Sequence, residues 1–299
     1  MSAGHTPVMV SEVLDLLAPR PGARIVDATT GHGGHAEAIL ERLVPDGVLV
    51  GLDRDAEMLA VAERRLARFG SAARLFHARF SFLREVVTGA GAAPVDGVLF
   101  DLGLSSYHFD ASGRGFSFAR SEPLDMRFDA NDAARETAAD VLRTRSVEEL
   151  AAIFRDFGEE RFAGRIAGRV LIERERTPIT TTTQLLDVIT AALPARFRWR
   201  ASRSAARIFQ ALRIAVNDEL EAVRTALPQA VSMLAPNGRL AVIAFHSLED
   251  RLVKQFFVAE RNAGRLRILT KRPLRPSEAE VADNSRAASA KLRVAERIR

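Results

Sequence analysis

The sequence of 299 residues contains no cysteine and no long apolar run. Without cysteine, disulfides, thiolate metal ligands and cysteine nucleophiles are excluded. The longest apolar runs, such as residues 239–245, are far shorter than the roughly 20 residues that a membrane-spanning helix needs. The first seven residues show no basic head followed by an apolar stretch, so no secretion signal is expected. We therefore expect a cytoplasmic protein with no membrane association.

Lysine is scarce as well, with only Lys254, Lys271 and Lys291, so arginine carries most of the positive charge. The net charge of +5 is uneven along the chain. Residues 1–142 sum to −6, residues 143–213 to +6, residues 214–250 to −3 and residues 251–299 to +8. Basic segments beside an acidic body favour a polyanionic partner such as nucleic acid. Ordinary solvated basic faces would give the same pattern.

The first hundred residues alternate between predicted strands and helices. Apolar runs predict strands at 24–28, 48–52, 74–77 and 96–100, and helical spacing predicts helices at 34–43 and 55–69. Such alternation is typical of a parallel sheet with right-handed crossovers.

The pattern changes after residue 101. Residues 102–132 are rich in Gly, Ser, Asp and Phe and predict a long ordered loop, and residues 133–211 show helical spacing. Strand signals return at 239–245, followed by a helix at about 248–260 and short strands near 266–270 and 291–295. We therefore predict an α/β fold, a doubly wound sheet over 1–108 and 212–299, with an inserted all-helical domain over 109–211.

A glycine-rich turn follows the first predicted strand. Gly31, Gly33 and Gly34 allow the backbone to approach a ligand at the carboxyl edge of the sheet. Asp53 ends the second predicted strand, where a carboxylate can accept both hydroxyl protons of an adenosine ribose. Asp27, at the tip of the first strand, could hold a cofactor ammonium or order the loop. It favours S-adenosylmethionine over NAD, because a dinucleotide motif normally runs from the strand directly into glycine.

Two alternatives stay open from these residues alone: an NAD-dependent dehydrogenase and a non-catalytic RNA-binding factor. A metal site is not expected. His32 and His35 form an H-x-x-H pair, but a zinc site needs further ligands and the chain has no cysteine.

Eight short strings then follow one another along the chain. They are His5-Thr-Pro7, Gly33-Gly34-His35, Asp101-Leu-Gly-Leu-Ser-Ser106, Arg114-Gly-Phe-Ser-Phe118, Pro123-Leu-Asp-Met-Arg-Phe-Asp129, Phe157-Gly-Glu-Glu-Arg161, Phe209-Gln-Ala-Leu-Arg-Ile214 with Val216-Asn217 and Glu219-Leu220, and Phe245-His-Ser-Leu-Glu-Asp-Arg251. In these strings, from His5 to about Glu296, the chain resembles the ribosomal RNA small-subunit methyltransferase H family of the MraW type.

The resemblance implies a Rossmann-like class I methyltransferase that uses S-adenosylmethionine. It implies methylation of the exocyclic N4 of a cytidine in the decoding region of 16S ribosomal RNA. The large basic insertion favours a 30S subunit or its late precursor as the substrate, and the sequence leaves open whether the protein is a homodimer. The family's cofactor positions carry over onto Gly33, Gly34, His35, Asp53, Phe80, Asp101 and His108.

Asp101 is the predicted catalytic residue. The lone pair of a cytosine amine is conjugated into the ring, so an acceptor for the amine protons beside the sulfonium helps the nitrogen to attack. Alternatively, Asp101 only orders its loop or contacts the cofactor. The lack of cysteine supports N-methylation independently, because methylation at pyrimidine C5 normally uses a thiolate.

RNA contacts are predicted in the insertion, with Arg198, Arg200 and Arg203 as phosphate ligands. A solvated helix face is the alternative. Aromatic side chains in the loop after Asp101 could stack an exposed base, or could form the core of the loop. His246 could face the same pocket or be a structural histidine. The aromatic candidates are Tyr107, Phe109, Phe116 and Phe118.

Overall fold

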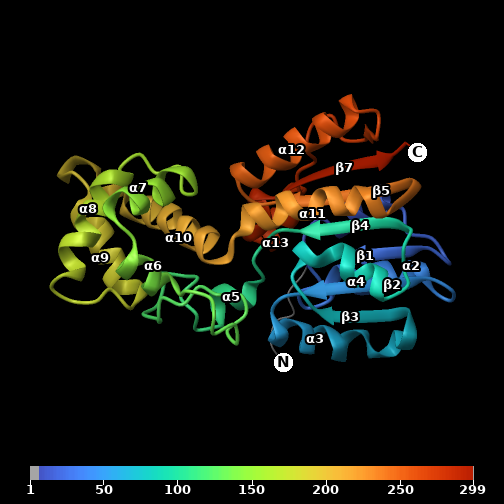
Figure 1. Cartoon of the computed structure of the whole chain (residues 1–299), viewed down its shortest axis with the longest axis horizontal. Helices are drawn as coiled ribbons and strands as arrows, with labels where there is room; N and C mark the ends of the chain where they lie inside the picture. The colour runs from blue at the N-terminus through green and yellow to red at the C-terminus, as the bar shows by residue number, and fades with distance from the viewer. Residues whose placement is uncertain (1–6, 299) are drawn as a thin grey trace. The chain divides into compact units, whose positions relative to one another are not determined.

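The structure is a computed structural model that describes residues 7–298, and of Ser106 only the backbone. His5 and Thr6 of the first predicted motif lie outside the described residues. The chain divides into two compact units (Figure 1). The sheet unit comprises the residues up to Ser105 and those from Leu220 onward, and the helical unit comprises Ser106–Glu219. Between residues 7 and 298, no helix combines the length and apolar character needed to cross a bilayer.

Within the described residues, seven strands form one sheet in the order β3-β2-β1-β4-β5-β7-β6. The first five run parallel to one another, as predicted. β7 is antiparallel to both of its neighbours. The strands are β1 (Arg24–Asp27), β2 (Val48–Asp53), β3 (Ala73–His77), β4 (Val95–Asp101), β5 (Leu234–Ala244), β6 (Leu266–Ile268) and β7 (Lys291–Arg297).

The direction of β7 follows from the connection that precedes it. Leu274 forms an antiparallel bridge to Leu292, so the chain after β6 lies beside the start of β7. The connection therefore lies at the end of the sheet where β7 begins. From there β7 runs in the direction opposite to β6. The same connection contains α13 (Glu278–Asp283), which the sequence analysis did not predict.

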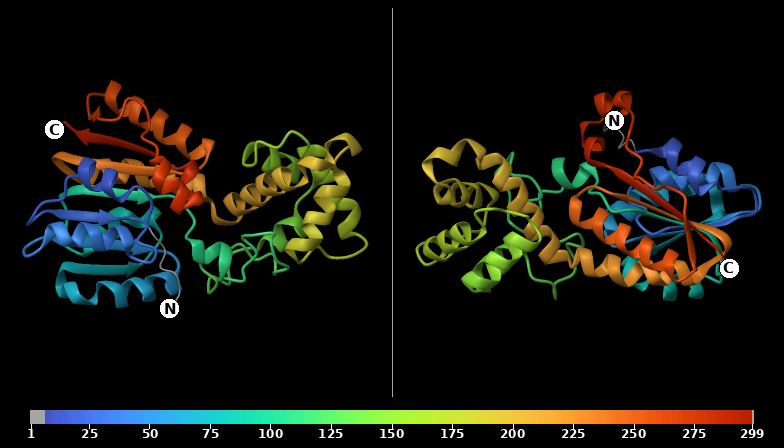
Figure 2. Two further views of the ribbon diagram at one scale, coloured as in Figure 1. Left: turned by 180° about the vertical axis from the view of Figure 1, so that it is seen from behind. Right: turned by 90° about the horizontal axis from the view of Figure 1, so that it is seen from above.

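Helices cover both faces of the sheet, which confirms the doubly wound arrangement (Figure 2). Neighbouring strand residues alternate between two cores: Val26 packs on one face and Ile25 on the other. The first core includes α4 (Leu83–Gly89), α11 (Glu219–Met233) and α12 (Ser247–Asn262). The second includes α1 (Val10–Leu17), α2 (Gly34–Leu43) and the end of α3 (Ala56–Leu66).

Several helices were missed or shifted by the sequence analysis. α1, α4 and α11 were not predicted, because each is a short or Pro-containing segment between stronger signals. α3 begins after Asp55 rather than at it. The Asp55 side chain accepts hydrogen bonds from the amides of Glu57 and Met58, so it caps the helix from outside.

The helical unit begins with α5 (Ser106–Asp110), a short helix inside the segment that was predicted to be loop. The remaining helices lie where helical spacing was predicted. The predicted insertion stops at residue 211, inside α10, whereas the compact unit extends to Glu219. The other helices are α6 (Ala138–Thr144), α7 (Val147–Asp156), α8 (Ala163–Arg174), α9 (Thr182–Ala192) and α10 (Ala201–Asn217).

The long loop of the helical unit is ordered by the last turn of α10. The Asn217 amide group donates to the Met126 carbonyl oxygen (2.7 Å), and its oxygen accepts from the Phe128 amide (3.0 Å). The Arg127 guanidinium donates to both carboxylate oxygens of Asp125, at 2.7 Å each. Because Asn217 is buried and its hydrogen bonds are satisfied, the extension of α10 beyond residue 211 belongs to this unit.

Candidate functional site

Three carboxylates end neighbouring strands at the carboxyl edge of the sheet. Asp27, Asp53 and Asp101 are the last residues of β1, β2 and β4, and these strands are adjacent in the order β2-β1-β4. The sequence analysis placed all three at strand tips. We call these three residues the acidic edge.

Asp53 holds the glycine turn in place. One of its oxygens accepts from the Gly31 amide (2.7 Å) and the other from the Asp55 amide (2.8 Å). A carboxylate oxygen can accept more than one hydrogen bond, so these two bonds do not by themselves exclude a ligand hydroxyl group. Gly31 has a positive φ of 52°, and a Cβ there would meet only the Thr29 carbonyl oxygen, at 4.0 Å. The turn is thus open beside Asp53.

The two glycines predicted to bind cofactor are also needed for packing. Gly33 has a φ of 80° and precedes α2, and a Cβ there would lie 3.3 Å from Cβ of Ala62. A Cβ on Gly34 would lie 2.9 Å from Pro7. The absence of side chains therefore lets α2 pack closely against α3 and the N-terminal segment. The cofactor role of both glycines stays a prediction.

Asp27 is buried and only half satisfied. Its Oδ1 accepts from the Thr29 amide (3.2 Å), whereas its Oδ2 is buried and has no hydrogen-bond partner among residues 7–298. Burial is the main cause that raises the pKa of Asp27 to about 7; the Thr29 hydrogen bond opposes this shift, and the charges of Asp101 and Asp53 add to it. A buried carboxylate oxygen without a donor suits a cationic group of a ligand.

Asp101 and His35 meet at the same edge. His35 Nδ1 lies 3.6 Å from the Asp101 Oδ2, and the His35 Nε2 lies 2.9 Å from the Val8 carbonyl oxygen. A carbonyl can only accept, so Nε2 carries a proton. Two arrangements of the pair are therefore possible. Either Nδ1 also carries a proton and donates to the Asp101 carboxylate, or Nδ1 is unprotonated and accepts from a protonated Asp101.

The pKa of Asp101 is raised above its usual range. Burial is the main cause and Glu249 adds to it, while His35 and the Gly103 amide act in the opposite direction. The backbone of Asp101 is also fixed, because its amide donates to the Thr29 hydroxyl (2.6 Å). Thr29, which the sequence analysis did not single out, thus links the tips of β1 and β4.

The remaining predicted cofactor residues lie in different units. Phe80 follows β3 and belongs to the sheet unit, with its ring edge-on to Phe100 at 5.6 Å between centroids. His108 lies in the helical unit, where it is buried and packs at 5.2 Å from both Phe116 and Phe128. The roles of Phe80 and His108 toward a cofactor stay predictions.

His246 caps a helix. It precedes α12 and forms a capping box with Glu249, and its Nε2 lies 3.0 Å from the Glu249 carboxylate. Glu249 is buried and also accepts from the Phe245 amide (2.9 Å). The sequence analysis missed Glu249, although a polar residue three positions before Glu at a helix start is the signal for such a cap.

The aromatic residues proposed to stack a base pack largely within the helical unit. Phe116 is buried and stacks on Phe128 at 5.4 Å, and Phe118 packs edge-on against Phe209 at 5.2 Å. For Phe116 and Phe118 the structure therefore favours the loop-core interpretation.

The three arginines predicted to contact RNA lie close together in the sequence, around the start of α10. Arg198 and Arg200 belong to the 3-10 helix η3 (Ala195–Arg200), and Arg203 lies in α10. Arg198 and Arg203 are exposed, and Arg200 is half-buried. None of the three forms an ion pair or a side-chain hydrogen bond with another residue between 7 and 298.

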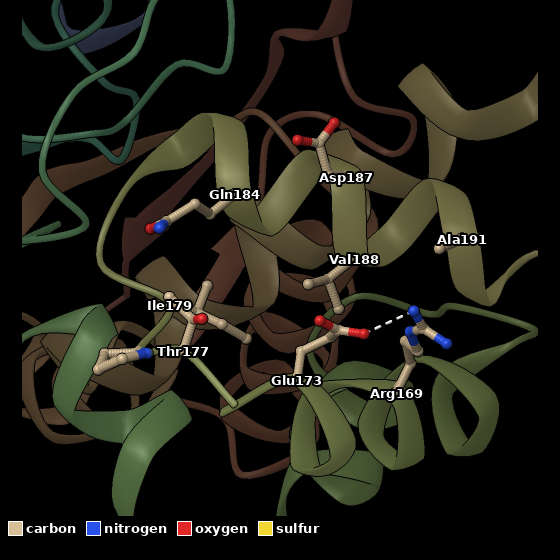
Figure 3. A pocket seen from close by; sticks show the side chains of 9 residues that line it. Arg169, Glu173, Thr177, Ile179, Gln184, Asp187, Val188 and Ala191 are labelled. Carbon is tan, nitrogen blue, oxygen red and sulfur yellow. Dashed lines mark ion pairs between the residues drawn. The ribbon is translucent and has the colours of Figure 1, made fainter. Parts of the chain in front are cut away.

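A cavity of about 290 Å³ lies between α8 and α9 of the helical unit (Figure 3). Its lining includes Arg169 and Glu173, which form an ion pair of 2.5 Å, together with the exposed Asp187. Since its arginine and glutamate neutralise each other, we assign this cavity no role.

Comparison with known proteins identifies relatives along the whole chain. Residues 2–298 match the model of the MraW methylase family. A protein of Syntrophotalea carbinolica named ribosomal RNA small subunit methyltransferase H is 47% identical, over 98% of this chain and 98% of its own. The proteins of the same name from Acidothermus cellulolyticus and Thermomicrobium roseum are 47% and 48% identical, over 99% and 100% of this chain and 94% and 95% of their own.

Proposed function

The chain belongs to the MraW methylase family, and we propose that it transfers a methyl group from S-adenosylmethionine to N4 of a cytidine in the decoding region of 16S ribosomal RNA. The family resemblance and the doubly wound fold predicted from the sequence are both confirmed. Membership in a methylase family also removes the dehydrogenase alternative. The single observation that carries the proposed chemistry is the pair formed by the half-buried Asp101 and the buried His35 at the acidic edge.

The acidic edge fits S-adenosylmethionine. Asp53, beside the open turn at Gly31, is placed to accept the ribose hydroxyls. Asp27 has a buried oxygen without a donor, which suits the ammonium of the amino-acid part. When bound, the cofactor supplies a methyl group on a sulfonium, which is activated for displacement without help from a metal.

Asp101 is the proposed proton acceptor. The cytidine nitrogen forms a bond to the methyl carbon while the carbon–sulfur bond breaks, and the nitrogen must then lose one proton. The carboxylate of Asp101 takes that proton, and His35, 3.6 Å away, stabilises the ionised acid beforehand. The loop-ordering alternative also has support, because the Gly103 amide donates to Asp101 Oδ1 at 3.4 Å.

The proposed substrate is the 30S subunit or its late precursor in the cytoplasm, with the helical unit as the RNA-recognition domain. The helical unit as a whole contains 18 basic and 17 acidic residues, so its net charge does not support this role. Support comes from segregation within the unit, because residues 143–213 sum to +6 and include the unpaired Arg198, Arg200 and Arg203.

Mass spectrometry of 16S RNA tests the proposal. RNA from cells that lack the gene should lose one methyl group on a cytidine N4. The wild-type gene should restore that methyl group and Asp101→Asn should not. An unchanged modification map would overturn the proposal. Binding of 30S particles without any methyl transfer from labelled S-adenosylmethionine would instead indicate a non-catalytic RNA-binding factor.

A further inference from the structure

The chain has a single tryptophan, and it lies at the surface of the helical unit. The Trp199 side chain is 74% exposed, more than any other large apolar side chain between residues 7 and 298. An exposed tryptophan loses the free energy that burial of its ring would contribute. Nothing in the core of the unit explains this ring, so its position calls for a partner outside the chain.

Arginine side chains surround Trp199 and its neighbours. The Arg200 guanidinium lies over the Trp199 ring, 4.5 Å from its centroid. Arg196, Arg161 and Arg200 lie 4.9, 5.7 and 5.9 Å from the centroid of the Phe197 ring. The Phe197 ring in turn packs on Phe162 at 5.3 Å. We call Arg161, Phe162, Arg196, Phe197, Trp199 and Arg200 the arginine–aromatic patch.

The charge of this patch is not neutralised within the chain. Its three arginines form no ion pair or side-chain hydrogen bond with another residue between 7 and 298, and neither do the flanking Arg198 and Arg203. The nearby Glu160 is buried and its carboxylate lies 3.8 Å from Arg207 instead. Five cations without a carboxylate, beside an exposed ring, distinguish this patch from an ordinary salt-bridged helix surface.

We propose that the arginine–aromatic patch binds a single-stranded RNA segment, with an unpaired base stacked on Trp199 and the neighbouring phosphates on the arginines. Arg200 covers one face of the ring and holds its orientation, and the high exposure of the side chain leaves the other face for a base. Guanidinium groups stack on rings and bind phosphates in two-point geometry, so both parts of a nucleotide find a matching group here. This inference rests on the proposed function, because it assumes an RNA substrate. It goes further by assigning Trp199 a contact with a base, whereas the proposed function needs only contacts with phosphates.

The lone tryptophan makes the proposal directly measurable. Its intrinsic fluorescence reports on residue 199 alone in the full-length protein. Titration with a short single-stranded oligoadenylate should quench this fluorescence, whereas inorganic polyphosphate should bind the arginines without quenching. Equal quenching by both ligands, or quenching by neither, would overturn base stacking. A response only to anionic phospholipid vesicles would assign the patch to a membrane surface instead.

Substitutions separate stacking from general apolar contact. Trp199→Ala and Trp199→Leu should weaken oligoadenylate binding by about 5- to 150-fold, and Trp199→Phe should retain most of the affinity because it keeps a ring. Ile172→Ala, which removes another exposed apolar side chain of the same unit, is the matched control and should bind as wild type. Wild-type affinity in Trp199→Leu would overturn the proposal.

Failure of this inference and failure of the proposed function give different results. If Trp199→Ala binds RNA normally while cytidine N4 is still methylated, only the stacking site is wrong. If RNA quenches Trp199 but no cytidine N4 is methylated by the wild-type protein, the binding site stands and the proposed reaction is wrong.

Discussion

The sheet unit and the helical unit place their charged side chains in opposite ways. In the sheet unit, three carboxylates lie at the tips of adjacent strands, where they accept from backbone amides or lie beside a buried histidine. In the arginine–aromatic patch of the helical unit, arginines lie against aromatic rings and lack carboxylate partners among residues 7–298. Acids that are held in place at a sheet edge suit a small cationic ligand, whereas surface guanidinium groups suit a polyanion.

The family motifs also do different work in the two units. In the sheet unit, His35 and Asp101 of two motifs meet at the acidic edge, and His246 of a third motif caps α12. Those of the helical unit mostly hold its own fold. The side chain of Gln210 donates to the Phe157 carbonyl (2.9 Å), which joins two motifs, and a Cβ on Gly158 would lie 2.7 Å from the Arg207 carbonyl oxygen. A motif residue is therefore not by itself a site residue.

The largest effect should come from the acidic edge. Asp101→Asn keeps the size of the side chain but removes the proton acceptor, so methyl transfer should fall by about 10²- to 10⁴-fold. Binding of cofactor and RNA should persist. Transfer of labelled methyl to 30S particles measures the rate. Asp96→Asn, at the opposite end of the same strand, is the control and should transfer at the wild-type rate. Normal transfer by Asp101→Asn would leave Asp101 with only its loop-ordering role.

The second largest effect is expected on RNA binding, when the arginines without carboxylate partners are replaced. If Arg198, Arg200 and Arg203 each contact a phosphate, their joint replacement by Ala should weaken RNA binding by roughly a hundredfold in moderate salt and lower the slope of log affinity against log salt by about 2–3. Cofactor affinity should not change, which would separate the two units functionally.

The control for this experiment removes the same charge from arginines that already have partners. Arg143, Arg145 and Arg155 form ion pairs with Asp140, Glu136 and Asp156, and their joint replacement by Ala should leave the salt slope near its wild-type value. Equal slopes for both triple variants would show that the unpaired arginines are only a solvated surface. RNA would then dock elsewhere, and the C-terminal segment that sums to +8 is the next candidate.

A smaller effect is expected for cofactor binding at Asp53. Asp53→Ala should weaken S-adenosylmethionine binding by about 1–3 kcal/mol, as measured by calorimetry, because ribose hydroxyls lose a half-buried acceptor. The turn at Gly31 also loses a hydrogen bond, so Asp53→Asn, which keeps one acceptor oxygen, should be milder. Asp46→Ala, an exposed acid before β2, is the control. Tight binding of NAD by the wild-type protein would contradict the assignment.

The pH dependence of cofactor binding should be the mildest test. Burial raises the pKa of Asp27 to about 7 in the free protein, and a cofactor ammonium would favour the ionised acid. Affinity should therefore fall as pH decreases below about 7, by at most about tenfold per pH unit, and level off above it. Proton release on binding at pH 7 can be read by calorimetry in buffers of different ionisation enthalpy. The Asp27→Asn variant should bind the cofactor more weakly, and its affinity should depend less on pH. An unchanged pH dependence would exclude Asp27 as the acid that binds the cofactor ammonium.

Local patterns in the sequence were sufficient for most of the sheet unit. Apolar runs located all seven strands, although β5 begins at Leu234, five residues before its predicted start. The signal was clear for the central parallel strands because a strand that is buried on both faces is nearly continuously apolar. The same patterns placed Asp27, Asp53 and Asp101 at strand tips, and strand adjacency then brings the three together.

The tertiary structure decided what strand and helix patterns do not encode. A buried oxygen without a donor on Asp27, the approach of His35 to Asp101 and the link through Thr29 depend on atoms from different elements. The packing of Phe116 and the exposure of Trp199 are equally beyond local pattern, since both are aromatic residues in polar or basic surroundings in the sequence. Local sequence determines periodicity and chain reversal, whereas burial and pairing depend on which distant segments pack against a side chain, and only the folded chain specifies that.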